Sequence, residues 1–379
     1  MRHLDIKESA SVSMMRLASE MREKGMHVLN FGIGEPDFTT PSEIIDHAFD
    51  SARRGGTHYT PSMGLLELRK EISKKLRERN NIVSSPDNVL VTPTKFAIFL
   101  SVMALTEPGD MVMIPDPYYL SYPDIIKLAG AEPLFVPTDD DYELDLDVAR
   151  RFVTSKTSVF ILNTPNNPTG KVYSEKSIRE LSDFILENNM YLISDEIYED
   201  IVFEGKHFSP GSIDEMAEKT VTISGFSKGF AMTGWRVGYL HAPDEVIKIC
   251  NRIQQQTITC APSISQYGAM KALNSYGSAE KFRDEFRKRR DLVYKLFSEI
   301  DGISLRKPEG TFYAFPSFDL DLRSPRFSHL LLQEKQVIVS PGTAFSRSGQ
   351  NRFRFSFAAS QKSITEGIRR IGEFIKERK

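Results

Sequence analysis

Five short apolar runs, separated by longer segments with helical spacing, constrain the fold of this chain most strongly. Each run is rich in apolar and β-branched residues and is bounded by turn residues, which is typical of buried strands. The runs are "NVLV" (88–91), "MVMI" (111–114), "SVFIL" (158–162), "MYLIS" (190–194) and "TVTIS" (220–224). Helical patterns such as "IRELSDFILENN" (178–189) lie between some of them. This alternation predicts an α/β fold with a mostly parallel sheet covered by helices on both faces.

The C-terminal part of the chain follows a different pattern. A charged helical stretch (281–299) precedes three short strand-like segments, "TFYAFP", "VIVSPG" and "RFRFSFA", and an amphipathic helix closes the chain. We therefore expect a smaller α+β domain made of residues 1–43 and 281–379, beside a large domain of residues 44–280.

Charge and composition exclude several classes of protein. A formal net charge of −2 provides no attractive field for nucleic acid or for an anionic membrane. Two cysteines, Cys250 and Cys260, cannot form a disulfide framework or a four-ligand zinc site. The N-terminal residues lack the apolar run of a signal peptide, and no stretch reaches the ~18 apolar residues of a membrane helix. We expect a cytoplasmic enzyme without a metal.

The residues that follow the five strands point to one site. In open parallel sheets, ligands bind outside the carboxyl ends of the strands. The predicted strands end in "TPTK" (92–95), "PDPYY" (115–119), "NTPNNPTG" (163–170), "DEIYED" (195–200) and "GFSK" (225–228). Together they present a helix N-terminus, an aromatic pair, an amide, a carboxylate beside a phenol, and a lysine. We expect these groups to surround one ligand.

The stretch "SGFSKGFAMTGWRVG" (224–238) places one lysine, Lys228, and one arginine, Arg236, among small residues. A lysine amine forms a Schiff base with an aldehyde when burial or a neighbouring cation favours the neutral amine. Arg236 can bind a phosphate on such an aldehyde, and the N-terminus of a helix that starts near Thr94 offers further N–H groups to it.

Other strand-end residues suit a pyridine ring. Asp195 is placed to hold a protonated ring nitrogen, which pyridoxal 5'-phosphate needs to act as an electron sink. Tyr198 and Asn167 can donate to the ring oxygen, and Tyr119 can stack on the ring face. The combination predicts pyridoxal 5'-phosphate as the cofactor.

With these residues in view, the chain resembles the class I/II aminotransferases of the pyridoxal-phosphate fold type I, close to the bacterial and archaeal aspartate aminotransferase branch. Matching blocks extend over roughly residues 11–375: "FGIGEPDF", "THYTPSMGLLELR", "NTPNNPTG", "SDEIYED", "GFSKGFAMTGWRVG" and "FRFSFA". The resemblance implies a transaminase whose large domain binds the cofactor, and a homodimer with sites at the subunit interface.

The resemblance also implies a role for each matching residue. Lys228 resembles the lysine that binds the cofactor covalently and moves the substrate proton, with Asp195 and Tyr198 as further catalytic residues. The implied cofactor-binding residues are Tyr59, Thr94, Lys95, Tyr119, Asn167, Asp195, Tyr198, Lys228 and Arg236. The implied substrate-binding residues are Ser11, Gly34, Lys95, Asn167 and Arg354. Arg354 resembles the arginine that pairs with the α-carboxylate, and Tyr59 resembles the tyrosine that reaches the neighbouring subunit's cofactor phosphate.

Three positions depart from the family pattern. The phosphate-binding turn, commonly glycine-rich, reads "TPTKF" here, and Gly225 stands where many relatives carry a phosphate-binding serine. Gln255 falls about where animal-type aspartate enzymes have an arginine for the distal carboxylate. In the bacterial branch, a lysine in the phosphate-binding turn and a hydroxyl near the N-terminus serve that purpose, and Lys95 and Ser11 match them.

The sequence favours transfer of an amino group from aspartate to 2-oxoglutarate by two successive half-reactions. An aromatic or broad-range aminotransferase and a C–S β-lyase stay open, because both share the cofactor residues. A cofactor-binding transcription regulator is disfavoured, since the residues that precede "FGIGEPDF" (31–38) are too few for a DNA-binding module.

Overall fold

A seven-stranded sheet forms the centre of the computed structural model, which describes residues 16, 19–21, 23 and 25–379. The strands, in spatial order, are β2 (Val89–Thr92), β8 (Gly238–His241), β7 (Thr220–Gly225), β6 (Tyr191–Asp195), β5 (Thr157–Asn163), β3 (Met111–Asp116) and β4 (Glu132–Pro137). Only β8 runs antiparallel to its neighbours in this sheet. The predicted mostly parallel sheet is confirmed, and β2, β3, β5, β6 and β7 all end at the same edge.

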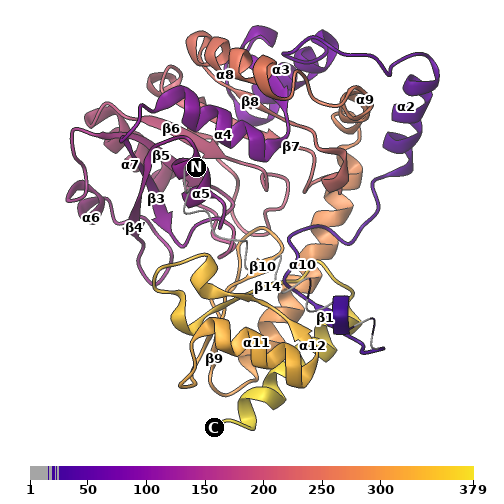
Figure 1. The fold of residues 1–379 in the computed structure, drawn as a ribbon, viewed down its shortest axis with the longest axis vertical. Helices are drawn as coiled ribbons and strands as arrows, with labels where there is room; N and C mark the ends of the chain where they lie inside the picture. Colours follow the sequence, from indigo (N-terminus) through magenta and orange to yellow (C-terminus); the bar gives the residue numbers. More distant parts are fainter. Residues whose placement is uncertain (1–15, 17–18, 22, 24) are drawn as a thin grey trace, which may run out of the picture.

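Helices cover both faces of this sheet (Figure 1). They are α2 (Ser42–Arg53), α3 (Leu66–Asn80), α4 (Thr94–Leu105), α5 (Tyr122–Leu128), α6 (Leu146–Arg150), α7 (Glu175–Glu187), α8 (Asp244–Thr257) and α9 (Ser263–Ala272). Helices α4, α5 and α8 share one hydrophobic cluster with the sheet, α6 and α7 share a second, and α2, α3 and α9 share a third.

Alternating side chains explain why both faces need a cover. In β3, Val112 and Ile114 join the cluster of α4, α5 and α8, whereas Met113 joins the cluster of α6 and α7. In β6, Ile193 joins the cluster of α4, α5 and α8, whereas Leu192 joins the cluster of α6 and α7. Successive residues of a strand point to opposite faces, so a strand that is apolar at every position buries both faces.

The C-terminal part packs around short strands. They are β1 (Leu29–Asn30), β9 (Ile303–Ser304), β10 (Tyr313–Ala314), β11 (Ser317–Phe318), β12 (Val337–Ile338), β13 (Ser340–Pro341) and β14 (Phe353–Ser356). Strand β1 pairs in parallel with β12, which brings the segment near residue 30 to the C-terminal part. Helices α11 (Ser324–Lys335) and α12 (Gln361–Lys376) pack there against a phenylalanine-rich cluster.

Helix α10 (Tyr276–Ser298) runs from the large sheet to the C-terminal part (Figure 1). It crosses the predicted boundary between residues 280 and 281, so the chain passes from one part to the other without a loop. The predicted domain limits stay a prediction.

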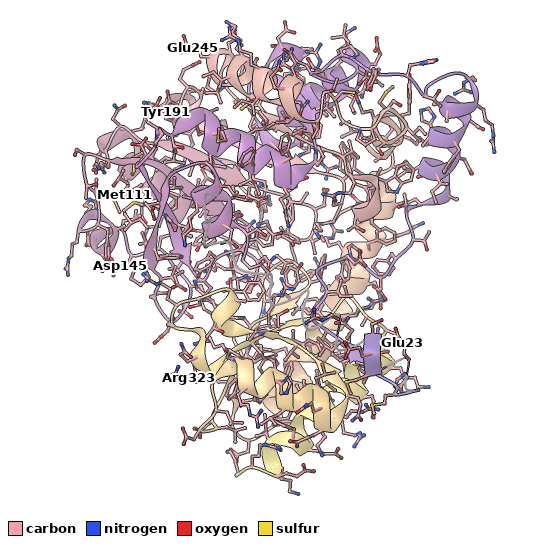
Figure 2. All side chains as sticks on the ribbon, viewed as in Figure 1. Glu23, Met111, Asp145, Tyr191, Glu245 and Arg323 are labelled. Carbon is pink, nitrogen blue, oxygen red and sulfur yellow. The ribbon has the colours of Figure 1, made fainter. Side chains whose placement is uncertain are left out.

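The strands of the large sheet run inward. Figure 2 shows Met111 and Tyr191, the first residues of β3 and β6, at the outer margin of the molecule, and the last residue of β6, Asp195, is buried. The charged side chains of Glu245 and Arg323 lie on the surface (Figure 2). None of the helices in the described residues is long and apolar enough to cross a membrane.

Candidate active site

A cavity of about 380 Å³ lies where β2, β3, β5, β6 and β7 end. The predicted site residues that line it are Gly34, Thr94, Lys95, Tyr119, Asn167, Asp195, Tyr198, Lys228, Arg236 and Arg354. Residues far apart in the sequence meet there because the ends of parallel strands share one edge of the sheet. The C-terminal part supplies the remaining wall through Tyr313, Ile338, Val339 and Ser340.

Lys228 follows β7 in a tight turn and projects into the cavity. Its Nζ donates a hydrogen bond to the backbone oxygen of Gly34 at 2.5 Å. Burial, together with the positive charges of Arg354 and Arg236, lowers the pKa of Lys228 to about 8. At neutral pH, the fraction of neutral amine is therefore on the order of 10²-fold greater than for an ordinary lysine. This side chain is prepared to act as a nucleophile and as a proton carrier.

Gly34 has a steric reason to be glycine. A Cβ atom at this position would lie 2.5 Å from the hydroxyl oxygen of Tyr313. The missing side chain lets the backbone carbonyl reach Lys228 beside that tyrosine.

Asp195 ends β6 and is buried in the cavity wall. Its Oδ2 accepts a hydrogen bond from the hydroxyl of Tyr122 at 2.7 Å, and its Oδ1 accepts one from the backbone N–H of Ile197 at 3.3 Å. Burial raises the pKa of Asp195 to about 6, although these hydrogen bonds favour the ionised form. A protonated ring nitrogen provides the positive partner that such a buried carboxylate needs.

Tyr198 lies one turn after Asp195 and faces the same cavity. Its hydroxyl lies 3.0 Å from the hydroxyl of Tyr313, and the two rings meet at an interplanar angle of 79°. Burial and the neighbouring Tyr313 raise the pKa of Tyr198 well above its ordinary value. Tyr198 therefore stays a neutral phenol and can donate a hydrogen bond to an anionic oxygen.

Helix α4 begins at Thr94, as the sequence predicted, and its N-terminus opens on the cavity. The buried Oγ1 of Thr94 has no hydrogen-bond partner among the described residues. A Cβ atom at position 225 would lie 2.7 Å from this oxygen and 2.8 Å from the Cα atom of Gly238. Thr94 thus lies against the space that a serine side chain at 225 would need, which gives a steric account of Gly225.

Arg236 lines the cavity and is exposed to solvent. Its backbone has a φ of 54°, and its Nη1 donates to the backbone oxygen of Thr233 at 2.8 Å. The Thr94 hydroxyl, the N-terminus of α4 and this guanidinium together form a donor set suited to a phosphate.

Arg354 lies in the middle of β14 and is only 3% exposed. Its Nη1 donates to Oδ1 of Asn167 at 3.0 Å, and its Nη2 donates to the backbone oxygen of Gly32 at 2.8 Å. The buried Nε has no partner among the described residues. A guanidinium that is this buried, with its Nε unsatisfied among the described residues, suits an anionic ligand.

Lys95 and Tyr119 form the outer part of the cavity wall. The Lys95 ammonium lies 5.7 Å from the centre of the Tyr119 ring. Tyr119 packs edge-on against Tyr122, with the ring centres 5.4 Å apart. Lys95 is exposed, so its charge is free to meet a ligand.

Three positions from the sequence stand outside this arrangement. Ser11 lies outside the described residues. Tyr59 is 86% exposed and, in the part of the chain that is described, is absent from the lining of the cavity. Gln255 is absent from that lining too, and its Nε2 donates to Oγ of Ser62 at 3.1 Å.

The sequence interpretation missed Tyr122 and Tyr313, which contact Asp195 and Tyr198. Tyr122 is the first residue of α5, and it stands three residues after Tyr119 in "YYLSY". Its nearness in the sequence to Tyr119 is the signal that could have identified it. Tyr313 lies in the apolar run "TFYAFP", where a tyrosine reads as a core residue.

Pyridoxal 5'-phosphate fits this donor set. Lys228 would bind its aldehyde carbon, and Asp195 would bind its ring nitrogen. The Thr94 hydroxyl, which has no hydrogen-bond partner in the part of the chain that is described, would bind its phosphate together with Arg236.

Comparison with known proteins agrees with this geometry. Residues 26–371 match the family model described as aminotransferase class I and II. The chain is 38% identical to aromatic-amino-acid aminotransferase 2 of Thermococcus litoralis, with 98% of each chain covered. It is 40% identical to an aspartate aminotransferase of Pyrococcus abyssi, over 93% of this chain and 92% of that protein. The solved structure of Thermus thermophilus aspartate aminotransferase with maleate superposes with a TM-score of 0.93, at 34% identity and 97% coverage of both chains.

The chain belongs to the class I and II aminotransferases. It is a pyridoxal 5'-phosphate-dependent aminotransferase, and its substrates are amino acids and keto acids.

Proposed function

We propose that this aminotransferase transfers the amino group of L-aspartate to 2-oxoglutarate in two half-reactions at the cavity described above. The observation that carries the proposal is the meeting of Lys228, Asp195 and Arg354 around one cavity. When bound, pyridoxal 5'-phosphate supplies the electron sink that accepts the electrons of the substrate Cα–H bond.

Lys228 is the proton carrier in this proposal. Its pKa of about 8 lets a substantial fraction of the amine take a proton from the substrate Cα near neutral pH. The hydrogen bond to the Gly34 carbonyl holds Nζ on the cavity side. Asp195 keeps the ring nitrogen protonated, and the Tyr198 hydroxyl donates to the ring oxygen.

Arg354 binds the substrate α-carboxylate. Its planar guanidinium is held by Asn167 and by the Gly32 carbonyl, and its Nε is unsatisfied among the described residues. A carboxylate would supply the missing acceptor and the opposite charge, and it would fix the orientation of Cα relative to Lys228.

Lys95 is proposed to bind the second carboxylate of aspartate, alone or with Ser11. This choice is supported by the exposed ammonium at the cavity wall and by relatives named aspartate aminotransferase. An aromatic-amino-acid aminotransferase is the second candidate, favoured by the relative of that name and by the apolar walls of Ile33, Leu120 and Ile338.

Replacing Lys95 with alanine separates the two candidates. We expect kcat/KM for aspartate to fall about 10–100-fold, because one charge-assisted hydrogen bond is lost, while kcat/KM for phenylalanine changes less than about threefold. The measurement is a panel of amino acids with 2-oxoglutarate, with exposed Lys74 on helix α3 replaced by alanine as the control. Equal losses for aspartate and phenylalanine would remove the case for dicarboxylate recognition. Release of ammonia, pyruvate and a thiol from a thioether amino acid, without transfer of the amino group to 2-oxoglutarate, would indicate a C–S β-lyase.

We further propose a homodimer in which Tyr59 reaches the cofactor phosphate of the partner subunit. The support is its 86% exposure outside the cavity of its own chain. Tyr59→Ala is expected to weaken cofactor binding about 10–100-fold, which corresponds to one hydrogen bond to a charged group.

Mixing subunits tests the homodimer directly. When Tyr59→Ala and Lys228→Ala chains are mixed in equal amounts, random exchange makes about half of the dimers heterodimers. Each heterodimer has one intact site and one site that lacks both residues, so about a quarter of all sites are intact. We expect activity to return toward that fraction at limiting cofactor. No recovery after proven exchange would place Tyr59 outside the partner's site.

Two broader expectations belong to the same proposal. Residues 1–43 with 281–379 would form one domain and residues 44–280 the other, supported by their largely separate hydrophobic clusters. A cytoplasmic location is supported by Cys250 and Cys260, which are both free thiols.

A further inference from the structure

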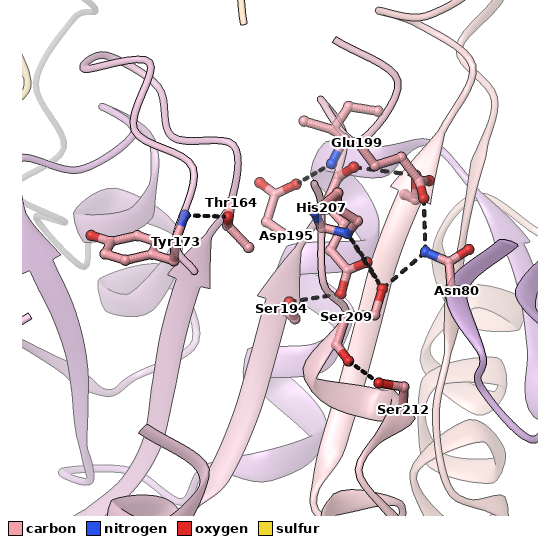
Figure 3. Close-up of polar contacts among 12 residues, drawn as sticks. Asn80, Thr164, Tyr173, Ser194, Asp195, Glu199, His207, Ser209 and Ser212 are labelled. Atoms are coloured by element: carbon pink, nitrogen blue, oxygen red, sulfur yellow. Dashed lines mark hydrogen bonds and ion pairs between the residues drawn. The ribbon is translucent and has the colours of Figure 1, made fainter. Parts of the chain in front are cut away.

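A buried polar layer lies directly behind the cavity wall, on the far side of the turn that follows β6. Asp195 and Tyr198 line the cavity, whereas the alternate residues Glu196 and Glu199 are absent from its described lining. Figure 3 shows Glu199, Asn80, His207 and Ser209 gathered beside the end of β6. The mechanism above uses none of these buried groups.

Glu199 accepts hydrogen bonds from three residues, two of helix α3 and one of strand β7. Its Oε1 lies 2.6 Å from the Lys75 ammonium of helix α3 and 2.5 Å from the Ser224 hydroxyl of strand β7. Its Oε2 accepts from the Asn80 amide at 2.8 Å. The side chains of Lys75 and Glu199 are only 6% and 9% exposed. Glu199 is therefore a buried carboxylate with donors on both oxygens.

The Lys75–Glu199 pair is charged. Burial alone would raise the pKa of Glu199, but the Lys75 ammonium lowers it below its ordinary value. Burial alone would lower the pKa of Lys75, but Glu199 raises it well above its ordinary value. The other titratable groups that face the pair are His207, Asp200, Tyr239 and Tyr276.

Glu196 is held in a similar way. It is fully buried, and its Oε1 accepts from Ser194 at 2.9 Å. Its Oε2 lies 2.7 Å from Nε2 of His207 and 2.5 Å from the Ser209 hydroxyl. Oxygen and nitrogen atoms of Glu196, Glu199 and His207 lie within 4.8 Å of one another, as in many metal sites. Here, however, the Lys75 ammonium already occupies the cationic position on Glu199.

The sequence positions of these contacts indicate a role for the buried polar layer. Glu199 directly follows Tyr198 and stands four residues after Asp195. Its partner Ser224 stands four residues before Lys228. The Glu199–Ser224 hydrogen bond therefore joins the segment that carries Asp195 and Tyr198 to the segment that carries Lys228. Buried ion pairs are seldom the most stable way to fill a core, so such a pair next to reacting groups calls for another role.

We propose that Glu199, held by Lys75, is a positioning residue whose hydrogen bond to Ser224 fixes the Asp195–Tyr198 segment relative to the Lys228 turn. The inference rests on the proposed roles of Lys228 and Asp195. Because small displacements of reacting groups reduce rates steeply, loss of this link should affect turnover more than folding.

Two double variants test the proposal. Lys75→Met with Glu199→Met removes both charges and the acceptor for Ser224, whereas Lys75→Met with Glu199→Gln removes the charges but keeps an oxygen acceptor. We expect the first to lower kcat about tenfold or more at saturating cofactor. It should also shift the absorbance midpoint, which is the pH at which the absorbance change of the bound cofactor is half complete. We expect the second to recover kcat to within about threefold. Both should keep the melting temperature of the unaltered protein.

Two single variants complete the design. Ser224→Ala, which leaves the Lys75–Glu199 pair intact, should shift the absorbance midpoint in the same direction and covers the case in which a double variant fails to fold. Arg290→Met removes an equally buried cation on helix α10 that contacts Glu204 and the Pro308 carbonyl. It should lower the melting temperature without changing kcat or the absorbance midpoint.

The outcomes separate this inference from the proposed function. Unchanged kcat and absorbance in both Ser224→Ala and the Met–Met variant would overturn the positioning role, as would equal losses in the two double variants. If Lys228→Ala keeps normal absorbance and turnover, the proposed function itself is wrong, whatever the network variants show.

Discussion

Lys228→Ala is expected to lose turnover by at least about 10²–10⁴-fold, the usual contribution of a positioned general base. The variant should also lose the near-visible absorbance that the cofactor acquires when it is bound covalently. The structural reason is that Lys228 is the lysine that projects into the centre of the cavity, with its pKa lowered to about 8 by burial and by Arg354. Lys95 lines the same cavity but is exposed at its outer wall.

The measurements are single-turnover kinetics with aspartate and absorbance spectra at saturating cofactor. Lys219→Ala is the matched control, because Lys219 immediately precedes β7, at the opposite end from Lys228, and binds Asn189 at 2.7 Å. Added methylamine should restore part of the activity of Lys228→Ala, since a free amine can carry the proton. Normal turnover in Lys228→Ala would contradict the assignment.

Asp195→Asn is the second change with a large expected effect. The amide cannot hold a proton on the ring nitrogen, so the ring loses its capacity as an electron sink. We expect kcat to fall about 10²–10³-fold at saturating cofactor, the range found when a preorganised electrostatic contact is removed. Tyr122 would still donate a hydrogen bond to the amide oxygen, so the site should keep its shape.

The readout for Asp195→Asn is kcat together with the cofactor dissociation constant. Asp183→Asn, on the exposed face of α7, makes the same chemical change away from the cavity and should leave both values unchanged. If only cofactor affinity falls and kcat is normal at saturating cofactor, Asp195 binds the ring without increasing its capacity as an electron sink.

Much of the cavity could be predicted from the sequence because of how parallel sheets are built. Asp195 and Lys228 each follow a short run, "MYLIS" or "TVTIS", that is rich in apolar and β-branched residues, and such runs are recognisable as buried strands. Once the strands are parallel, their ends must meet at one edge, which brought Thr94, Tyr119 and Asn167 to the same cavity.

Contacts that depend on packing across the chain could not be predicted in this way. The hydrogen bond between Tyr122 and Asp195 joins residues that are 73 positions apart, and the contact between Tyr198 and Tyr313 spans 115 positions. No local pattern specifies such pairs. Gly225 shows the same limit, because only the structure reveals that Thr94 lies against the space of a side chain at 225.

Short or irregular elements also could not be predicted from the sequence. Strand β8 (Gly238–His241) contains a glycine and a histidine and lacks an apolar run, yet it pairs with β2 and β7. Its place is set by its neighbours, since a half-apolar segment becomes a strand when two strands offer free backbone groups. The buried Lys75–Glu199 pair could not be predicted either, because a lysine in a charged helix such as α3 is expected to be exposed.

The most direct test of the account is to identify the residue that bonds to the cofactor. Treatment of the cofactor-loaded protein with borohydride makes a covalent link between lysine and the cofactor aldehyde permanent, and peptide mass spectrometry then locates it. We expect a single modified peptide, with the added mass on Lys228. A modification found on Lys95 or on another lysine, or no modification in a protein that turns over aspartate, would contradict this assignment.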